Sequence, residues 1–355
     1  MENTIPQVNE LLRTASESRA SDLHLTVGLP PMMRIDGELA RMSDIPILNT
    51  QNTDELLRQI TTERQYDDFV KVGAVDFSHS IEGFGRYRVN AYRQRNATAI
   101  ALRLIPSGIP SVEKLGLPSI ISDLARKASG LILVTGVTGS GKSTTLAAMI
   151  GQINEEESLH ILTLEDPIEF LHRHKKSMVN QREIGTDVPS FASGLRSALR
   201  EDPDVILVGE MRDYDTTQIA VSAAETGHLV LATLHTPSAA QTIDRIIDIF
   251  PSHQQAQIRI QLASSLQGVI AQQLLPRIDM LGRIAAFEVM IATPAVRNLI
   301  REVKTHQLPS VIQTGMKWGM ITMESSLKNL LQKGLISQQT YALYSTEASI
   351  MKIIE

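Results

Sequence analysis

The residues with the clearest chemistry form a glycine-rich stretch near the middle of the chain. Residues 136–143 read GVTGSGKS and fit the pattern G-x-x-x-x-G-K-[ST]. Glycines let successive backbone N–H groups turn inward around a phosphate, and the N-terminus of a following helix adds positive potential. The stretch lies between a strand-like apolar run and a run with helical spacing, which is the context that this motif requires. The sequence therefore predicts a nucleotide-binding loop.

Each part of the loop has an expected role. Backbone N–H groups would bind phosphate oxygens, the Lys142 ammonium would reach the β- and γ-phosphates and assist catalysis, and the Ser143 hydroxyl would ligate Mg²⁺. The alternative is a glycine-rich turn without a ligand, which the flanking strand and helix disfavour. The predicted nucleotide-binding residues are Gly136, Val137, Thr138, Gly139, Ser140, Gly141, Lys142, Ser143 and Thr144.

A carboxylate at the end of a neighbouring strand is expected to hold the metal or to orient the attacking water. The segment DPDVILVGEMRD (202–213) supplies Glu210 after four apolar residues. An aspartate usually precedes this glutamate, but Gly209 stands there, so we assign Glu210 to polarising water. The alternative is a surface glutamate that ends a strand.

A second acidic strand end occurs in HILTLEDPIEF (160–170). Its crowded carboxylates repel one another unless positive charge is close, and a Mg²⁺–phosphate centre would supply that charge. We predict that Glu165 contributes to catalysis, although Asp166-Pro167 could instead be only a turn. The predicted metal-binding residues are Ser143, Glu165, Asp166 and Glu210.

Histidines and arginines give further candidates. His228 and His235 flank the strand-like LVLATL, roughly 20 Å or more apart if extended, which excludes a zinc pair. They could sense the γ-phosphate, contact another subunit, or simply end the strand. Between positions 83 and 112, the chain has five arginines and no acidic residue. They could form a solvated basic face, bind nucleic acid, or supply an arginine finger. These arginines are Arg86, Arg88, Arg93, Arg95 and Arg103.

The elements that would position these residues fall into two groups. The apolar runs 131–136, 160–166, 205–210 and 229–234 alternate with stretches of helical spacing, which predicts a parallel sheet covered on both faces. The expected helices are 142–153, 190–201, 214–226 and 238–249, followed by a strand at 283–291 and helices at 292–304, 306–315, 322–333 and 337–350.

The first hundred or so residues predict a smaller α+β module. We expect strands at 22–28, 32–40, 74–81, 85–94 and 98–105, and helices at 6–18 and 53–70. A segment rich in proline and glycine separates the groups. The predicted division is an N-terminal domain at 1–107, a linker at 108–118, and an ATPase domain with a helical C-terminal region at 119–355.

Composition excludes several classes of protein. The chain has 355 residues, 43% of them hydrophobic, no cysteine, and a formal net charge of −5. Disulfides, thiolate metal sites and cysteine nucleophiles are therefore excluded. The net charge gives no general attraction to nucleic acid or anionic lipid. No apolar run approaches the roughly 20 residues of a bilayer span. The first residues lack a basic start followed by an apolar stretch, so we expect no secretory signal. We expect a cytoplasmic protein that meets a membrane only peripherally.

Taken together, the motifs resemble the secretion-ATPase superfamily, and within it the branch that powers type IV pilus retraction and twitching motility. Little sequence precedes the first module, and the four-cysteine zinc site common in pilus-assembly relatives is absent, which favours the retraction branch. The segments that carry the resemblance are ASDLHL (20–25), PMMRIDGEL (32–39), GRYRVNAYRQR (85–95), GVTGSGKSTTLAAM (136–149), HILTLEDPIEF (160–170), NQREIG (180–185), ALREDPDVILVGEMRD (198–213), AAETGHLVLATLHT (223–236) and AVRNLIRE (295–302).

The resemblance implies an α/β fold, with a RecA-like P-loop core domain, a smaller α+β PAS-like N-terminal domain, and a ring of six copies. It casts Glu165 and Asp166 as an acidic box, Glu210 as the catalytic glutamate, and His228 and His235 as a histidine box. It also implies that N-terminal arginines reach a nucleotide across an interface. We rank Arg88 and Arg93 first, and with His235 they complete the predicted catalytic set.

The implied function is an ATPase motor that couples hydrolysis of ATP, with Mg²⁺, to motion between its domains. The implied partners are other copies of the chain, a platform protein in the inner membrane, and an assembly ATPase or a paralogue. The alternatives are an assembly or type II-type secretion ATPase, a nucleic-acid translocase, and a scaffold that binds nucleotide without hydrolysis. The acidic net charge and the 4% aromatic content argue against the translocase.

Overall fold

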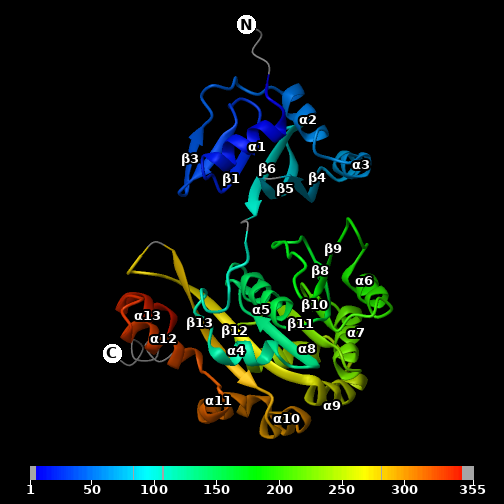
Figure 1. The fold of residues 1–355 in the computed structure, drawn as a ribbon, viewed down its shortest axis with the longest axis vertical. Helices are drawn as coiled ribbons and strands as arrows, with labels where there is room; N and C mark the ends of the chain where they lie inside the picture. Colours follow the sequence, from blue (N-terminus) through cyan, green and yellow to red (C-terminus); the bar gives the residue numbers. More distant parts are fainter. Residues whose placement is uncertain (1–4, 83, 106–107, 281, 346–355) are drawn as a thin grey trace. The chain divides into compact units, whose positions relative to one another are not determined.

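The structure is a computed structural model that describes residues 5–82, 84–105, 108–280 and 282–345. The chain divides into two compact units (Figure 1). The first comprises the residues up to Gly108 together with Pro167–Leu171, and the second comprises Ile109–Asp166 and the residues from His172 onward. Within the described residues, no helix is long and apolar enough to span a bilayer.

The first unit is built on a six-stranded antiparallel sheet in the order β3-β2-β1-β6-β5-β4. Side chains alternate between its faces, and those of Leu23, Val89 and Leu102 pack with helices α1 to α3 in one core. The elements are α1 Val8–Glu17, β1 Asp22–Leu25, β2 Met32–Ile35, β3 Glu38–Arg41, α2 Thr50–Arg58, α3 Glu63–Val72, β4 Ala74–Ile81, β5 Gly85–Gln94 and β6 Ala97–Ile105.

Two elements of this unit differ from the sequence-based expectation. The strand expected at 32–40 is a hairpin, because Asp36 (φ 49°) and Gly37 (φ 91°) form a tight turn between β2 and β3. The helix expected at 53–70 is two helices. The Thr62 side chain accepts a hydrogen bond from the Gln65 N–H and the Gln65 side chain accepts one from the Thr62 N–H, so a capping box starts α3 afresh.

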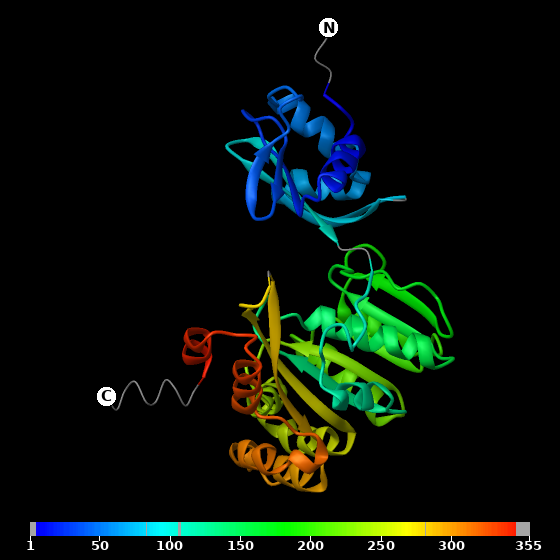
Figure 2. The ribbon, with the colours of Figure 1, turned by 60° about the vertical axis from the view of Figure 1, so that its left-hand side comes forward.

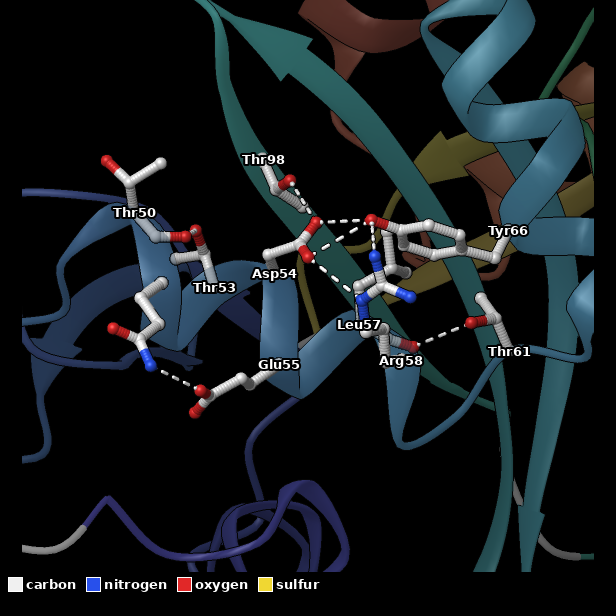
Figure 3. Close-up of polar contacts among 10 residues, drawn as sticks. Thr50, Thr53, Asp54, Glu55, Leu57, Arg58, Thr61, Tyr66 and Thr98 are labelled. Carbon is white, nitrogen blue, oxygen red and sulfur yellow. Dashed lines mark hydrogen bonds and ion pairs between the residues drawn. The ribbon is translucent and has the colours of Figure 1, made fainter.

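A polar cluster fastens the two helices together (Figure 3). The Tyr66 hydroxyl from α3 donates to Asp54 of α2 at 2.9 Å, and the Arg58 Nε donates to the same carboxylate at 3.0 Å. The Arg58 guanidinium also lies 3.8 Å from the centre of the Tyr66 ring. Thr98 of β6 reaches Asp54 at 3.5 Å, so the cluster links both helices to the sheet.

The second unit contains a seven-stranded sheet in the order β13-β12-β7-β11-β10-β8-β9. All neighbours pair in parallel except β12 and β13. Helices cover both faces (Figure 2): α4 and α5 pack on one, and α6 to α11 on the other. The strands are β7 Gly130–Thr135, β8 His160–Glu165, β9 Met178–Glu183, β10 Val205–Val208, β11 Leu229–Leu234, β12 Leu266–Pro276 and β13 Arg283–Ile291.

The helices of this unit include a C-terminal group that begins after β13. They are α4 Ser119–Ala125, α5 Lys142–Glu156, α6 Phe191–Ala198, α7 Tyr214–Glu225, α8 Ala239–Asp248, α9 Gln255–Ser265, α10 Pro294–Arg301, α11 Leu308–Thr314, α12 Met323–Gln332 and α13 Gln338–Tyr344. Short 3-10 turns lie at 252–254, 305–307 and 316–318. The part of the predicted last helix beyond residue 345 lies outside the described residues.

Two strands of this sheet were absent from the sequence-based expectation. β9 carries charged and amide side chains at the edge of the sheet, so it lacks an apolar run. β12 is mostly buried but contains Gln272 and Gln273, which interrupt its apolar pattern. Neither strand was predicted, because polar side chains replace part of the apolar pattern by which a strand is recognised in a sequence.

The segment after Gly108, predicted as a linker, packs as part of the second unit from Ile109 onward. Val112 is buried, and Leu117 packs against the core that contains α4 and α5. In the C-terminal region, Val296 and Ile300 of α10 are buried as their spacing predicts. The predicted helix at 292–304 ends earlier, because Val303 lies beyond α10 with φ 62° and 61% of its surface exposed.

Candidate functional site

The glycine-rich loop connects β7 to α5 as the motif predicts. Gly136, Gly139 and Gly141 have backbone φ angles of 144°, 77° and 90°, which residues other than glycine rarely adopt. Lys142 is the first residue of α5, and its Nζ donates to the carbonyl oxygens of Gly136 (2.9 Å) and Val137 (3.1 Å). The ammonium group is thereby folded over the loop, where it can meet a bound phosphate.

The exposed tip of this loop and the start of α5 provide the remaining predicted nucleotide contacts. Val137 and Thr138 are exposed, whereas Ser143 and Thr144 are half-buried in the first turn of α5. Backbone N–H groups at a helix start have no partner inside the helix and attract anions. The loop therefore presents a lysine, two hydroxyls and a helix N-terminus on adjacent residues.

Gln272 of β12 is a residue of this site that sequence reasoning missed. Its side chain is almost fully buried beneath the loop, donates to the Ser140 carbonyl at 2.6 Å, and accepts from the Thr145 hydroxyl at 2.9 Å. The sequence does contain a signal for it, which is the pair of glutamines inside the apolar run VIAQQLLP. A glutamine buried in such a run needs hydrogen-bond partners for its side-chain amide.

The order of strands decides which predicted residues come together. The carboxyl ends of β7, β11, β10 and β8 follow one another along one edge and carry the loop, His235, Glu210 and Glu165, respectively. Glu210 was expected on a strand neighbouring the loop strand, but β11 lies between β10 and β7. The sequence could not reveal this, because strand order in a parallel sheet depends on the crossovers.

Glu210 and His235 are in contact at this edge. The His235 Nε2 lies 3.2 Å from the Glu210 Oε1, and the Arg212 Nε lies 2.6 Å from the same oxygen. Burial raises the pKa of Glu210, but the hydrogen bond from Arg212 and the charges of His235 and Arg212 outweigh it, so the pKa is lower than usual. Glu210 is therefore held as a carboxylate.

Gly209 has a steric reason to replace the usual aspartate. A Cβ atom at this position would lie 3.0 Å from the Leu164 carbonyl oxygen and 3.3 Å from the Glu165 Cα. The Gly209 N–H also donates to the Leu164 carbonyl at 2.7 Å. Close approach of β8 thus makes this position tight, and a side chain before Glu210 would require β8 to shift by a few tenths of an ångström.

Glu165 lies at the end of β8, which is not adjacent to the loop strand. Its strand, β8, is three positions from β7, about 14 Å at the usual strand spacing. Its carboxylate accepts hydrogen bonds from the Thr163 hydroxyl (2.6 Å) and the Gln181 amide (3.0 Å), and Asp166 is exposed. The predicted role of Glu165 beside the same magnesium ion as Ser143 therefore stays a prediction.

His228 and His235 lie at opposite ends of β11, a central strand of the second sheet. His228 precedes β11, and its Nδ1 is 3.0 Å from the Ala223 carbonyl oxygen. His235 follows β11 on the side of the loop and Glu210. Only His235 is placed to act with the predicted catalytic residues of its own chain.

The five candidate arginines between positions 83 and 112 lie on or beside β5 and β6. Arg88 is exposed, and its side chain makes no hydrogen bond or ion pair within the described part of the chain. Arg93 lies on the opposite face of β5, with its guanidinium 5.6 Å from the centre of the Phe69 ring. Arg103 pairs with Asp22 at 2.8 Å, and Arg86 bonds the Ser78 hydroxyl. Arg95 occupies the turn after β5.

The donor set fits magnesium only in the manner of a P-loop protein. Among the residues that the structure describes, no group of three or more histidine, cysteine, aspartate or glutamate side chains could hold a metal. P-loop proteins instead hold Mg²⁺ between a loop hydroxyl and the nucleotide phosphates, with a carboxylate nearby. The Ser143 hydroxyl at the start of α5 is a donor of this kind.

Comparison with known proteins establishes the class. A family model described as Type II/IV secretion system protein matches residues 2–339, and the chain belongs to this family. The predicted family and the predicted α/β fold class are thus confirmed.

Individual relatives narrow the comparison. The type IV pilus retraction ATPase PilT of Pseudomonas aeruginosa is 51% identical over 94% of this chain and 96% of its own length. An Escherichia coli protein named YggR, whose name states no function, is 49% identical over 92% of this chain and 99% of its own length. A crystal structure of the pilus retraction motor PilT with bound ADP matches with a TM-score of 0.91 and 48% identity, covering 98% of this chain and 99% of the other.

Proposed function

We propose that this chain is an ATPase that powers the retraction of type IV pili. The observation that carries the proposal is the loop between β7 and α5, with its three left-handed glycines and buried Lys142, beside the Glu210–His235 pair at the same edge of the sheet. The similarity to retraction ATPases over nearly the full length of both chains supports the same activity.

The loop and Lys142 bind and orient ATP in this proposal. Backbone N–H groups of residues 136–144 take the phosphate oxygens, and Lys142 exchanges its bonds to the Gly136 and Val137 carbonyls for the β- and γ-phosphates. Positioning and charge stabilisation account for most catalysis of phosphoryl transfer.

Glu210 polarises the attacking water, because its carboxylate stays ionised beside Arg212. The contact with the imidazole of His235 fixes the direction of the carboxylate. Mg²⁺, held by Ser143 and the phosphates, would neutralise charge on the β- and γ-phosphates. Asp166 and Glu165 are further away in the same chain, so we assign them to supporting the acidic edge and not to direct ligation.

A ring of six copies completes the proposal. Arg88 is exposed on β5 and free of partners within the described residues, so it is our first candidate for reaching a nucleotide bound by a neighbouring copy. Arg93 and Arg95 rank behind it, because Arg93 already stacks on Phe69. The ring would work at the cytoplasmic face of the inner membrane against a platform protein of the pilus machine, together with an assembly ATPase or a paralogue.

A deletion strain tests the biological role. Cells without this chain should carry excess surface pili and lose twitching motility, and a Lys142→Ala copy should fail to restore either. Cells that lack pili altogether would instead identify an assembly motor. Unchanged pili together with a defect in protein export would identify a secretion motor of another envelope machine.

A further inference from the structure

The floor of the phosphate loop is formed by a strand that joins the sheet much later in the chain. β12 runs parallel to β7 with Ala271 opposite Thr135, so Gln272 lies level with Gly136, the first residue of the loop. A Cβ atom on Gly136 would lie 2.3 Å from the Gln272 backbone oxygen, and one on Gly141 would lie 3.0 Å from its Nε2. The Gln272 backbone thus excludes a side chain at Gly136, and the Gln272 side chain makes the space beside Gly141 tight.

The side chain of Gln272 joins the loop to the helix that follows it. Its Nε2 donates to the Ser140 carbonyl at 2.6 Å, and its Oε1 accepts from the Thr145 hydroxyl of α5 at 2.9 Å. Gln272, Ser140 and Thr145 are 1%, 1% and 2% exposed, so water cannot replace these bonds without rearrangement.

The bond to Ser140 has a directional consequence for phosphate binding. A peptide group is planar and trans, so the Ser140 C=O and the Gly141 N–H point in opposite directions. Holding the carbonyl against Gln272 therefore aims the Gly141 N–H away from β12. Without the bond, this peptide could rotate cheaply, because Gly141 tolerates a wide range of backbone angles.

We infer that Gln272 is a positioning residue for nucleotide binding, which fixes the Ser140–Gly141 peptide and the first turn of α5 in the orientation that receives phosphate. The inference rests on the proposed function, since it concerns the same loop. It adds a residue from β12, outside the segments that define the nucleotide motif.

The chain supplies a matched control on the same strand. Gln267 of β12 donates from its Nε2 to the Ser129 carbonyl at 3.0 Å, beside Gly130, at the opposite end of β7. A Cβ atom on Gly130 would lie 2.6 Å from the Gln267 side chain. Gln267 thus makes the same kind of bond beside a glycine, but far from the phosphate loop.

The test compares Gln272→Met with Gln267→Met in the full-length protein. Both variants should lose thermal stability, since each removes a glutamine amide bond to a backbone carbonyl. Only Gln272→Met should weaken ADP binding and raise KM for ATP, by about tenfold, because misplacing a phosphate donor by a fraction of an ångström is costly. Gln267→Met should keep both values within about twofold of the unmodified protein.

A second variant provides a test of the same contact if Gln272→Met does not fold. Thr145→Val removes the hydroxyl that holds the Gln272 oxygen and keeps the shape of the side chain. It should weaken ADP binding about threefold, and the double variant should show less than the product of the two effects, because both act through one contact.

Equal ADP affinity in Gln272→Met, Gln267→Met and the unmodified protein would overturn the inference, as would fully independent effects of the Gln272 and Thr145 substitutions. ADP binding does not require retraction, so these results leave the proposed function standing. Tight ADP binding that depends on Gln272, in a protein whose deletion does not change pili, would contradict the proposed function alone.

Discussion

Glu210 and His235 come from adjacent strands and meet at the edge of the sheet where the phosphate loop begins. The histidine side chain is 39% exposed and the glutamate 17% exposed, so the pair can contact a nucleotide or water without unfolding any element. A residue that orients a catalytic group should affect turnover more than substrate affinity. His235 therefore acts through Glu210 in our account.

Replacing His235 with alanine should lower kcat for ATP hydrolysis by about ten- to a hundredfold and leave KM within about threefold. Steady-state phosphate release across ATP concentrations measures both values. The control is His253→Ala, which alters an exposed histidine in the 3-10 turn before α9 and should not change either. A His235→Ala variant with normal kcat would remove this histidine from the mechanism.

At the scale of elements, the first sheet carries a row of charges across neighbouring strands. Arg88 of β5 lies opposite Arg103 of β6, and Arg103 lies opposite Asp22 of β1. Burial raises the pKa of Asp22. Hydrogen bonds from Ser21 and Arg103, together with the positive charges nearby, lower the pKa by more than burial raises it, so the pKa is below its usual value. A carboxylate of this kind stabilises the fold above its unfolded pKa, and that stabilisation is lost as the pH falls through the folded pKa.

Arg103→Met should therefore destabilise β1 and β6 at pH 7, by no more than about 1 kcal/mol because the arginine is largely exposed, and by less below about pH 4. Hydrogen exchange of peptides from these strands, corrected for the intrinsic rate at each pH, measures the effect. Arg88→Met is the control and should be neutral or slightly stabilising, because it removes a like charge opposite Arg103. Equal destabilisation by Arg103→Met at both pH values would show that the ion pair contributes nothing.

Some strands of the second sheet could be predicted from the sequence and others could not, for physical reasons. The apolar runs of β7, β8, β10 and β11 are buried on both faces, so their hydrophobicity predicted them correctly. β12 was not predicted because glutamines interrupt its apolar pattern, and two of them, Gln272 and Gln267, form hydrogen bonds with backbone carbonyls distant in the sequence. Those partners are known only once the fold is known.

The candidate site shows the same division. The position of the loop from Gly136 to Ser143 between a strand and a helix was predicted correctly, because its sequence pattern is local, while its binding of nucleotide stays a prediction. The contact of Glu210 with His235, the place of β8 away from the loop strand, and the close approach of β8 to Gly209 all depend on strand order. Sequence spacing carries no information about that order.

At the scale of the whole molecule, the proposed ring requires residues from two copies at each nucleotide. A ligand can shift the arrangement of domains only by its differential affinity for the alternatives, so ATP and ADP must contact the interface differently. An arginine from the first unit of a neighbouring copy would sense the γ-phosphate in this way. Arg88 is our candidate because it is exposed and unpaired in the described part of the chain.

Mixing two inactive variants tests action between copies. Arg88→Ala and Glu210→Ala proteins should each hydrolyse ATP at least about a hundredfold more slowly than the unmodified protein. Rings assembled from both should regain activity, because some sites would combine Glu210 from one copy with Arg88 from its neighbour. Full inactivity of the mixed rings, with mixing confirmed by mass, would place both residues in the same copy or exclude Arg88.

The central claim is that ATP binds at the loop beginning with Gly136 and is cleaved with the help of Glu210. Its most direct test is to load the Glu210→Gln protein with ATP, isolate the complex by gel filtration, and identify the bound nucleotide. Our account predicts uncleaved ATP in the Glu210→Gln protein, ADP in the unmodified protein, and neither in a Lys142→Ala protein. Release of ADP by Glu210→Gln at the unmodified rate would contradict it.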